Sequence, residues 1–218
     1  LRGFIKPGDT CIDIGAHTGD TSLPMGLAAE KAGTVFALEP NSYVYETLQT
    51  NANLNPDKYT IIPLPFAATT TDAEMTFEYS DSGFCNGGLH ENISVWRHGH
   101  MYKLKVTGKN LSDYLNKNYP EKLPRLKFIK IDAEGYDLSI LKSIDSMISK
   151  YLPYLRVEVY KKTDNGYRSE MFEYLKNKGY RVFLFNSPES YYGKELTVNE
   201  LMDKKHFDIF ATPPGAGQ

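Results

Sequence analysis

The sequence predicts an α/β fold with a doubly wound, mostly parallel sheet of about seven strands and helices on both faces. Short apolar runs alternate with helix-length segments along most of the 218 residues. The runs are nearly continuous in apolar residues, which is typical of strands covered on both sides. Acidic, glycine-bearing turns follow two of the runs, at the strand ends where such sheets bind ligands. We expect a single domain over residues 1–218, with its functional site at the carboxyl ends of the strands.

The N-terminal part of the chain alternates strand and helix. The first run, "TCIDIG", is a buried strand, and the helix after it is expected to end at a glycine. Strands are expected at 10–15, 34–40 and 59–69, and helices at 21–33 and 42–55. Parallel strands joined by helices imply right-handed crossover connections.

An insertion is expected at about 72–107. The runs "AEMTFEYS" and "YKLKVTG" alternate with period two and flank a long polar stretch. This pattern indicates a hairpin or a long loop between sheet units, and long loops in compact domains are usually functional or disordered. A short helix is expected next, in "NLSDYLNKNYP".

The alternation of strand and helix then resumes up to the C-terminus. Strands are expected at 126–135, 155–160, 180–186 and 205–213, and helices at 137–151 and 169–179. No internal repeat and no low-complexity segment interrupts this order.

Composition narrows the class of protein. The chain is 41% hydrophobic with a net charge of -2, so it lacks the basic surface expected of a nucleic-acid binder. Its two cysteines form no CxxC motif, and no apolar stretch approaches the length of a membrane span. No signal peptide is visible, which makes the cytoplasm the expected compartment. Because the chain begins at Leu1, we expect a fragment or processed form that lacks an N-terminal segment.

The turn after the first strand indicates a cofactor site. In "DIGAHTG", Asp13 precedes Gly15 and Gly19, and the next helix follows at once. Gly15 lets the chain turn, and backbone amides there can face a ligand. Glu39 ends the second strand, where a carboxylate can accept both hydroxyls of a ribose. Together these residues predict an adenosine-bearing cofactor; a plain strand–helix turn and a capping acid are the alternatives.

A second acidic turn, "KIDAEGYD", follows the strand at 126–135. If that strand continues, Asp132 and Glu134 point to the same side, and Asp137 follows the glycine. Ligand contact, base catalysis or a cation would explain this crowding, as would a solvated acidic loop. Glu158 lies inside a buried strand, so we expect Lys130 or an arginine to pair with it, or Glu158 to face the active-site cleft.

Two stretches carry a family resemblance. "DIGAHTGDTS…FALEPN" and "FIKIDAEGYDLSIL" resemble the FkbM family of S-adenosylmethionine-dependent O-methyltransferases, which have a Rossmann-like fold. The second stretch is the more specific, because the first is shared with many other methyltransferases. The chain departs from the family in having His17 where asparagine is common, and residues from about 80 to 105 match no family motif.

The resemblance implies roles for individual residues. The cofactor site would comprise Asp13, Gly15, Ala16, His17, Gly19, Glu39, Asn41, Ala67 and Asp132. The catalytic candidates are Asp132, Glu134 and Glu158, since a hydroxyl is a poor nucleophile and a base should take its proton. The cofactor would be S-adenosylmethionine, and the acceptor a hydroxyl of a sugar, a glycosylated metabolite or another small molecule.

A divalent cation is possible but not required by the sequence. Asp132, Glu134 and Glu158 could offer oxygen ligands to magnesium or calcium. His98 and His100 form only a weak candidate pair. We therefore expect no metal, and keep the three carboxylates as the alternative metal site.

Other functions stay open at this point. A nicotinamide-dependent oxidoreductase would also use the glycine turn and Glu39, but it should carry the GxGxxG motif that the chain lacks. A non-catalytic module that binds an adenosyl cofactor is a further alternative. Ribose methylation of RNA would need a lysine–acid set and a basic surface, and neither is apparent. Trp96 and Tyr102 could stack on a sugar ring.

Overall fold

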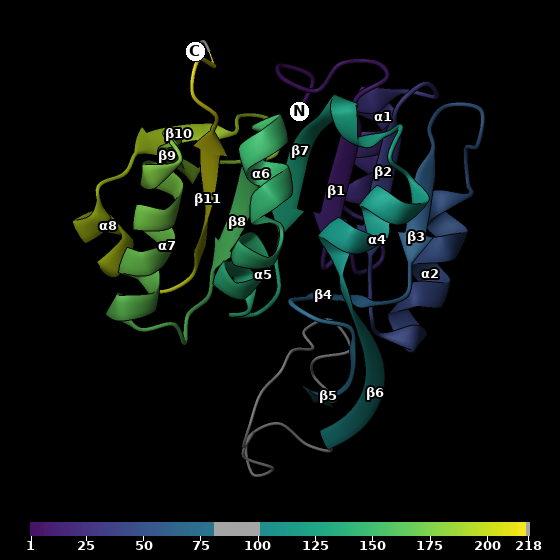
Figure 1. The fold of residues 1–218 in the computed structure, drawn as a ribbon, viewed down its shortest axis with the longest axis horizontal. Helices are drawn as coiled ribbons and strands as arrows, with labels where there is room; N and C mark the ends of the chain where they lie inside the picture. Colours follow the sequence, from purple (N-terminus) through teal and green to yellow (C-terminus); the bar gives the residue numbers. More distant parts are fainter. Residues whose placement is uncertain (81–100, 217–218) are drawn as a thin grey trace.

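The main feature of the fold is an eight-stranded sheet (Figure 1). The structure is a computed structural model and describes residues 1–80 and 101–216. The strands of the main sheet are β1 (Thr10–Ile14), β2 (Thr34–Leu38), β3 (Ile61–Leu64), β7 (Leu126–Ile131), β8 (Tyr154–Val159), β9 (Arg181–Phe185), β10 (Tyr192–Glu195) and β11 (Phe207–Thr212). Their order is β10-β9-β11-β8-β7-β1-β2-β3.

The expected doubly wound, mostly parallel sheet is confirmed. β1 pairs in parallel with both β2 and β7, and β3 and β8 extend the two sides. The order therefore reverses between β1 and β7, which is the switch point where such sheets bind ligands. β11 enters antiparallel between β8 and β9. The strand count of seven was too low, because the short, mostly exposed "YGKE" of β10 has no apolar run to reveal it.

Helices cover both faces of the sheet, as expected. They are α1 (Ser22–Ala29), α2 (Ser42–Ala52), α4 (Leu111–Asn118), α5 (Asp137–Ser143), α6 (Asp145–Tyr151), α7 (Asn165–Asn177) and α8 (Val198–Met202), with a 3-10 turn at Leu123–Arg125. Successive strand residues point to opposite faces. Ile12 and Phe36 pack in one core cluster with α4 to α7, while Cys11 and Val35 pack in the other with α1 and α2. Figure 1 shows α4 to α7 together on one face.

Two helices differ from the sequence prediction. α1 ends at Ala29 and not at Gly33, because Glu30 has a positive φ of 57° that stops the helix. The helix expected at 137–151 is divided into α5 and α6 at Ile144, whose ψ of 18° departs from helical values. Both differences are local backbone events that hydrophobic periodicity does not report.

A second, three-stranded sheet lies beyond the carboxyl ends of the parallel strands (Figure 1). It comprises β4 (Ala67–Thr69), β5 (Ala73–Ser80) and β6 (Met101–Asn110), in the order β4-β6-β5. β5 and β6 pair antiparallel, as expected for a hairpin. The strand expected at 59–69 is divided: β3 ends at Leu64 and β4 pairs with β6 in the second sheet. Pro65 lies between them and cannot donate a ladder hydrogen bond.

Within the described part of the chain, no helix combines the length and apolar character needed to cross a bilayer.

Candidate functional site

Asp13 is the buried anchor at the end of β1. Its side chain is 0% exposed, and its Oδ2 accepts hydrogen bonds from the hydroxyls of Thr21 and Ser22, both at 2.6 Å. Its Oδ1 lies 3.3 Å from Lys130 Nζ, an ion pair without hydrogen-bond geometry. Asp13 therefore ties β1 to the start of α1 on one side and to β7 on the other.

Lys130 links the two acidic turns. Its buried Nζ donates to the Gly15 carbonyl at 3.0 Å and lies 3.3 Å from Asp132 Oδ2. Burial by itself lowers the pKa of Lys130, but Asp13 and Asp132 outweigh it and leave the pKa raised. Of the two alternatives for Glu158, the first, in which Lys130 or an arginine pairs with it, is wrong. A lysine between acids, which was not apparent in the sequence, does exist at the switch point.

The turn after β1 is shaped by its neighbours. Gly15 has a φ of 76°, and a Cβ there would lie 2.0 Å from the Asp132 carbonyl oxygen. The amides of Gly15 and Ala16 both donate to the Leu38 carbonyl, at 3.1 and 2.9 Å. The amides of Gly15 and Ala16 are therefore already engaged within the protein. Glycine is required because the loop after β7 passes so close. Gly19, with a φ of 98°, lies farther along the same turn.

Glu39 organises the turns after β1 and β2. Glu39 is 8% exposed; its Oε2 accepts from the His17 amide at 3.0 Å and its Oε1 from the Asn41 amide at 2.8 Å. Burial raises the pKa of Glu39, and these amides oppose the rise. Asn41 caps α2 by accepting from the Tyr43 amide at 3.1 Å. Each oxygen of the Glu39 carboxylate keeps a further lone pair that can accept a hydrogen bond from a hydroxyl.

The acidic turn after β7 does not continue the strand. β7 ends at Ile131, and Glu134 and Gly135 have φ values of 52° and 101°. The expectation that Asp132 and Glu134 alternate along a strand is therefore wrong. The Asp132 side chain is 40% exposed, and among the described residues its carboxylate is paired only with Lys130.

Asp137 holds this turn in place from within. It is 0% exposed, and its two oxygens accept from the amides of Ala133 and Gly135, both at 3.0 Å. Burial raises the pKa of Asp137 to about 7, although these amides oppose the rise. The Tyr167 hydroxyl donates to the Gly135 carbonyl at 3.0 Å and accepts from the Leu138 amide at 2.8 Å. The turn is thus fixed by two side chains: Asp137, which the sequence analysis grouped with the clustered acids, and Tyr167, which had no expected role.

Glu158 is closed off from solvent. It is 3% exposed; Oε2 accepts from the Glu134 amide at 2.9 Å, and Oε1 lies 2.7 Å from His206 Nε2. Burial raises the pKa of the Glu158 carboxyl to about 9, and the carboxylates of Asp132, Asp137 and Glu134 add to the rise. Sequence reasoning missed His206, because it stands 48 residues away in a polar loop without a motif.

The cation alternative gains no support from this arrangement. Within residues 1–80 and 101–216, no three or more His, Cys, Asp or Glu side chains could together hold a metal ion. Of the three carboxylates in the alternative, Glu158 already has both oxygens engaged. His98, His100 and Trp96 lie outside the described residues, as does the side chain of Tyr102.

The described site gathers the predicted residues around the switch point. Asp13, Glu39 and Asp132 lie at or just after the carboxyl ends of β1, β2 and β7, which are adjacent in the sheet. Ala67 begins β4 in the second sheet and is 9% exposed. Doubly wound sheets bind ligands in the crevice outside the carboxyl ends of the strands at this point, so the arrangement suits a cofactor site of the Rossmann-like class.

Comparison with known proteins identifies the family. Residues 13–182 match the family model described as the methyltransferase FkbM domain, and the chain belongs to that family of S-adenosylmethionine-dependent methyltransferases. This assignment replaces the nicotinamide alternative. Methyltransferase sdnD from Sordaria araneosa is 27% identical over 192 residues, which cover 78% of this chain and 73% of sdnD.

Solved structures share the fold. Methyltransferase FkbM from Methylobacillus flagellatus KT aligns with a TM-score of 0.57 and 17% identity over 94% of this chain. This chain spans 43% of the length of that protein. Fibrillarin from Aeropyrum pernix, in complex with natively bound S-adenosyl-L-methionine, aligns with a TM-score of 0.51 and 12% identity over 95% of this chain and 68% of its own.

The residues present fit S-adenosylmethionine. Glu39 is a buried carboxylate whose two oxygens can each accept one more hydrogen bond, which suits the two hydroxyls of a ribose. In the turn after β1, His17 Nε2 is buried without a hydrogen-bond partner among the described residues. A buried polar atom without a partner is costly, so a bound polar ligand would relieve it.

Proposed function

We propose that this protein transfers a methyl group from S-adenosylmethionine to a hydroxyl of a small molecule, a sugar or a glycosylated metabolite. One observation carries the proposal: the buried Glu39 and the partly exposed Asp132 flank β1 at the switch point. One acid suits the ribose of a cofactor, and the other faces outward, where an acceptor can approach. The sugar class of the acceptor rests on the resemblance to the FkbM family, which is an argument by analogy.

The cofactor site in this proposal is made by three turns. Glu39 accepts the ribose hydroxyls, and Asn41 fixes Glu39 through its backbone amide. Asp13 acts indirectly, because its oxygens are occupied by Thr21, Ser22 and Lys130. The remaining proposed contacts come from the glycine turn, from the start of β4 and from the end of β7: Gly15, Ala16, His17, Gly19, Ala67 and Asp132. When bound, S-adenosylmethionine supplies an electrophilic methyl group on a sulfonium.

The acceptor side is formed by the turn after β7. Asp132 is the more exposed acid, and we assign it to binding and orienting the acceptor hydroxyl. Glu134 is a second contact; burial raises the pKa of its carboxyl, the charge on Asp132 adds to the rise, and a hydrogen bond with Tyr160 opposes it. Glu158 is too buried to reach an acceptor, so its role would be to position other groups.

Calorimetric titration of Glu39→Ala tests the cofactor site. S-adenosylmethionine and S-adenosylhomocysteine should bind the wild type while NAD does not. The variant should bind both about 30-fold more weakly, because charge-assisted hydrogen bonds are worth about 2 kcal/mol. Glu46→Ala, an exposed acid on α2, is the matched control and should bind normally. Unchanged affinity of Glu39→Ala, with normal circular dichroism, contradicts the ribose role.

Turnover tests the acceptor class. Formation of S-adenosylhomocysteine is followed with methyl hexopyranosides, simple phenols and primary amines as acceptors. Products are expected with hydroxyl acceptors, and Asp132→Asn should slow their formation about 100-fold, since misplacing the acceptor is costly. Methylation of amines alone refutes O-methylation. Cofactor binding without any product favours the non-catalytic module instead.

A further inference from the structure

A buried carboxylate faces an exposed imidazole at the carboxyl end of β8. Glu158 Oε1 lies 2.7 Å from His206 Nε2; the Glu158 side chain is 4% exposed and that of His206 is 46% exposed. His206 Nδ1 makes no hydrogen bond within the part of the chain that the structure describes. A base whose second nitrogen is held by a carboxylate is the arrangement used to activate hydroxyl nucleophiles.

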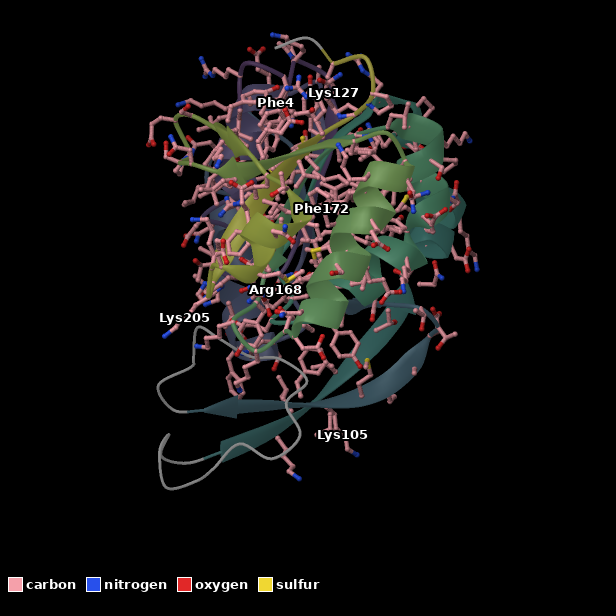
Figure 2. All side chains as sticks on the ribbon, turned by 90° about the vertical axis from the view of Figure 1, so that its left-hand side faces the viewer. Phe4, Lys105, Lys127, Arg168, Phe172 and Lys205 are labelled. Carbon is pink, nitrogen blue, oxygen red and sulfur yellow. The ribbon has the colours of Figure 1, made fainter. Side chains whose placement is uncertain are left out.

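The pair lies at the same end of the sheet as the proposed acceptor site. His206 immediately precedes β11, and its neighbour Phe207 pairs with Val159, the last residue of β8. Glu158 also accepts from the amide of Glu134, in the turn after β7. Figure 2 shows Arg168 and Lys205 at the end of the molecule that faces the second sheet, opposite Phe4 and Lys127.

A buried arginine fixes the loop that carries His206. Arg168 in α7 is 4% exposed, and the two Nη atoms of its guanidinium donate to backbone carbonyls. It donates to the carbonyls of Tyr160, Leu201, Lys204 and Lys205. These carbonyls lie in the loop after β8, in α8 and in the segment between α8 and β11. A buried cation that holds these segments together keeps the His206 imidazole close to the Glu158 carboxylate.

We infer that His206 is the base that takes the acceptor proton in the proposed methyl transfer, with Glu158 as its positioning residue. The inference rests on the proposed function. The acceptor oxygen forms the new O–C bond while the C–S bond breaks, its electron pair going to sulfur. The hydroxyl proton passes to His206 Nδ1 and then to solvent. Glu158 accepts from Nε2–H, which keeps the lone pair on Nδ1 and stabilises the cation that forms.

The geometry favours His206 over the two acids predicted from the sequence. Asp132 lies 3.3 Å from the Lys130 ammonium, an ion pair that would be lost if Asp132 took a proton. Glu134 is hydrogen-bonded to Tyr160 and shares its environment with other carboxylates.

Charges around the pair predict how turnover depends on pH. Three acidic side chains face the pair from the turn after β7: Asp132, Glu134 and Asp137. Tyr160 and Lys161 lie in the loop after β8, and the Tyr160 ring is 5.8 Å from the His206 ring. Burial and these acids raise the pKa of the Glu158 carboxyl to about 9. Only an ionised Glu158 accepts from Nε2–H and leaves the lone pair on Nδ1, and turnover should therefore rise with pH toward that value.

The test combines turnover with nuclear magnetic resonance of the histidine rings. His206→Asn and Glu158→Gln should each lower kcat about 100-fold, within the range of general-base catalysis. Their affinity for S-adenosylmethionine should stay within twofold of the wild type. In Glu158→Gln the amide can donate to Nε2 and place the proton on Nδ1, which removes the lone pair. Lys205→Ala, an exposed neighbour in the same loop, is the control.

The outcomes separate the two proposals. The base role is supported if both variants lose kcat. In Glu158→Gln, turnover should also stop increasing with pH, and the tautomer of His206 should change. Turnover of His206→Asn within threefold of wild type on methyl hexopyranosides overturns the base role and leaves O-methylation standing. If Glu158→Gln leaves the spectrum of the His206 ring unchanged, the positioning role of Glu158 is overturned as well. A wild type that binds S-adenosylmethionine but forms no product overturns the proposed function itself.

Discussion

Lys130→Met tests whether one buried cation holds the switch point together. The methionine fits the space but leaves Asp13 as a fully buried carboxylate without a counter-charge. Removing one partner of a buried ion pair costs about 3–5 kcal/mol. The hydrogen bond to the Gly15 carbonyl, worth about 1–2 kcal/mol, is lost as well. Because domains are stable by only about 5–15 kcal/mol, the change is large enough to measure easily.

Urea unfolding followed by far-ultraviolet circular dichroism provides the measurement. Lys127→Met is the matched control, since Lys127 lies on the same strand and only approaches the Tyr154 ring, at 5.2 Å. It should cost less than about 1 kcal/mol. Adding Asp13→Asn to Lys130→Met removes the uncompensated charge and should recover about 2 kcal/mol relative to additive behaviour.

Two results would refute the reasoning. If Lys130→Met costs no more than Lys127→Met, the ion pair contributes little beyond the side-chain volume. If the unfolding free energies of Lys130→Met and Asp13→Asn are additive in the double variant, Lys130 does not stabilise the charge on Asp13.

Three further predictions concern the turns and the cation. Gly15→Ala should destabilise the fold by about 3 kcal/mol or more, because the backbone strain at positive φ adds to the clash of a Cβ 2.0 Å from the Asp132 carbonyl oxygen. Gly215→Ala is the control: its φ is 79° with no atom within 4 Å, and it should cost only about 1 kcal/mol in the same urea assay. Since the folded-state pKa of Asp137 is raised to about 7, the free energy of unfolding should fall as pH rises from about 4 to about 7; Asp137→Asn should lose that part of the slope, and equal slopes would contradict it. Excess EDTA should leave cofactor binding and turnover unchanged, and a chelator-sensitive rate would restore the cation alternative.

The main sheet was predictable because its strands and helices are encoded by local patterns. Continuous apolar runs, and glycines near the ends of helices, predicted the bounds of most elements to within a few residues of those observed. Asp13, Glu39 and Asp132 could be assigned to one edge of the sheet, since parallel strands bring their carboxyl ends together. β10 was missed because an exposed edge strand has no apolar run, and the break at Ile144 because it leaves the periodicity intact.

The sequence by itself determined the fold class, the family and the acids that end adjacent strands, because each depends on residues close together in the chain. Only the tertiary structure decided which charges meet. Lys130 reaches the Gly15 carbonyl across 115 residues, and His206 reaches Glu158 across 48. Both contacts follow from strand order: β7 pairs with β1, and β11 enters antiparallel beside β8. No local period carries that order, because strand pairing is set by packing over the whole sheet.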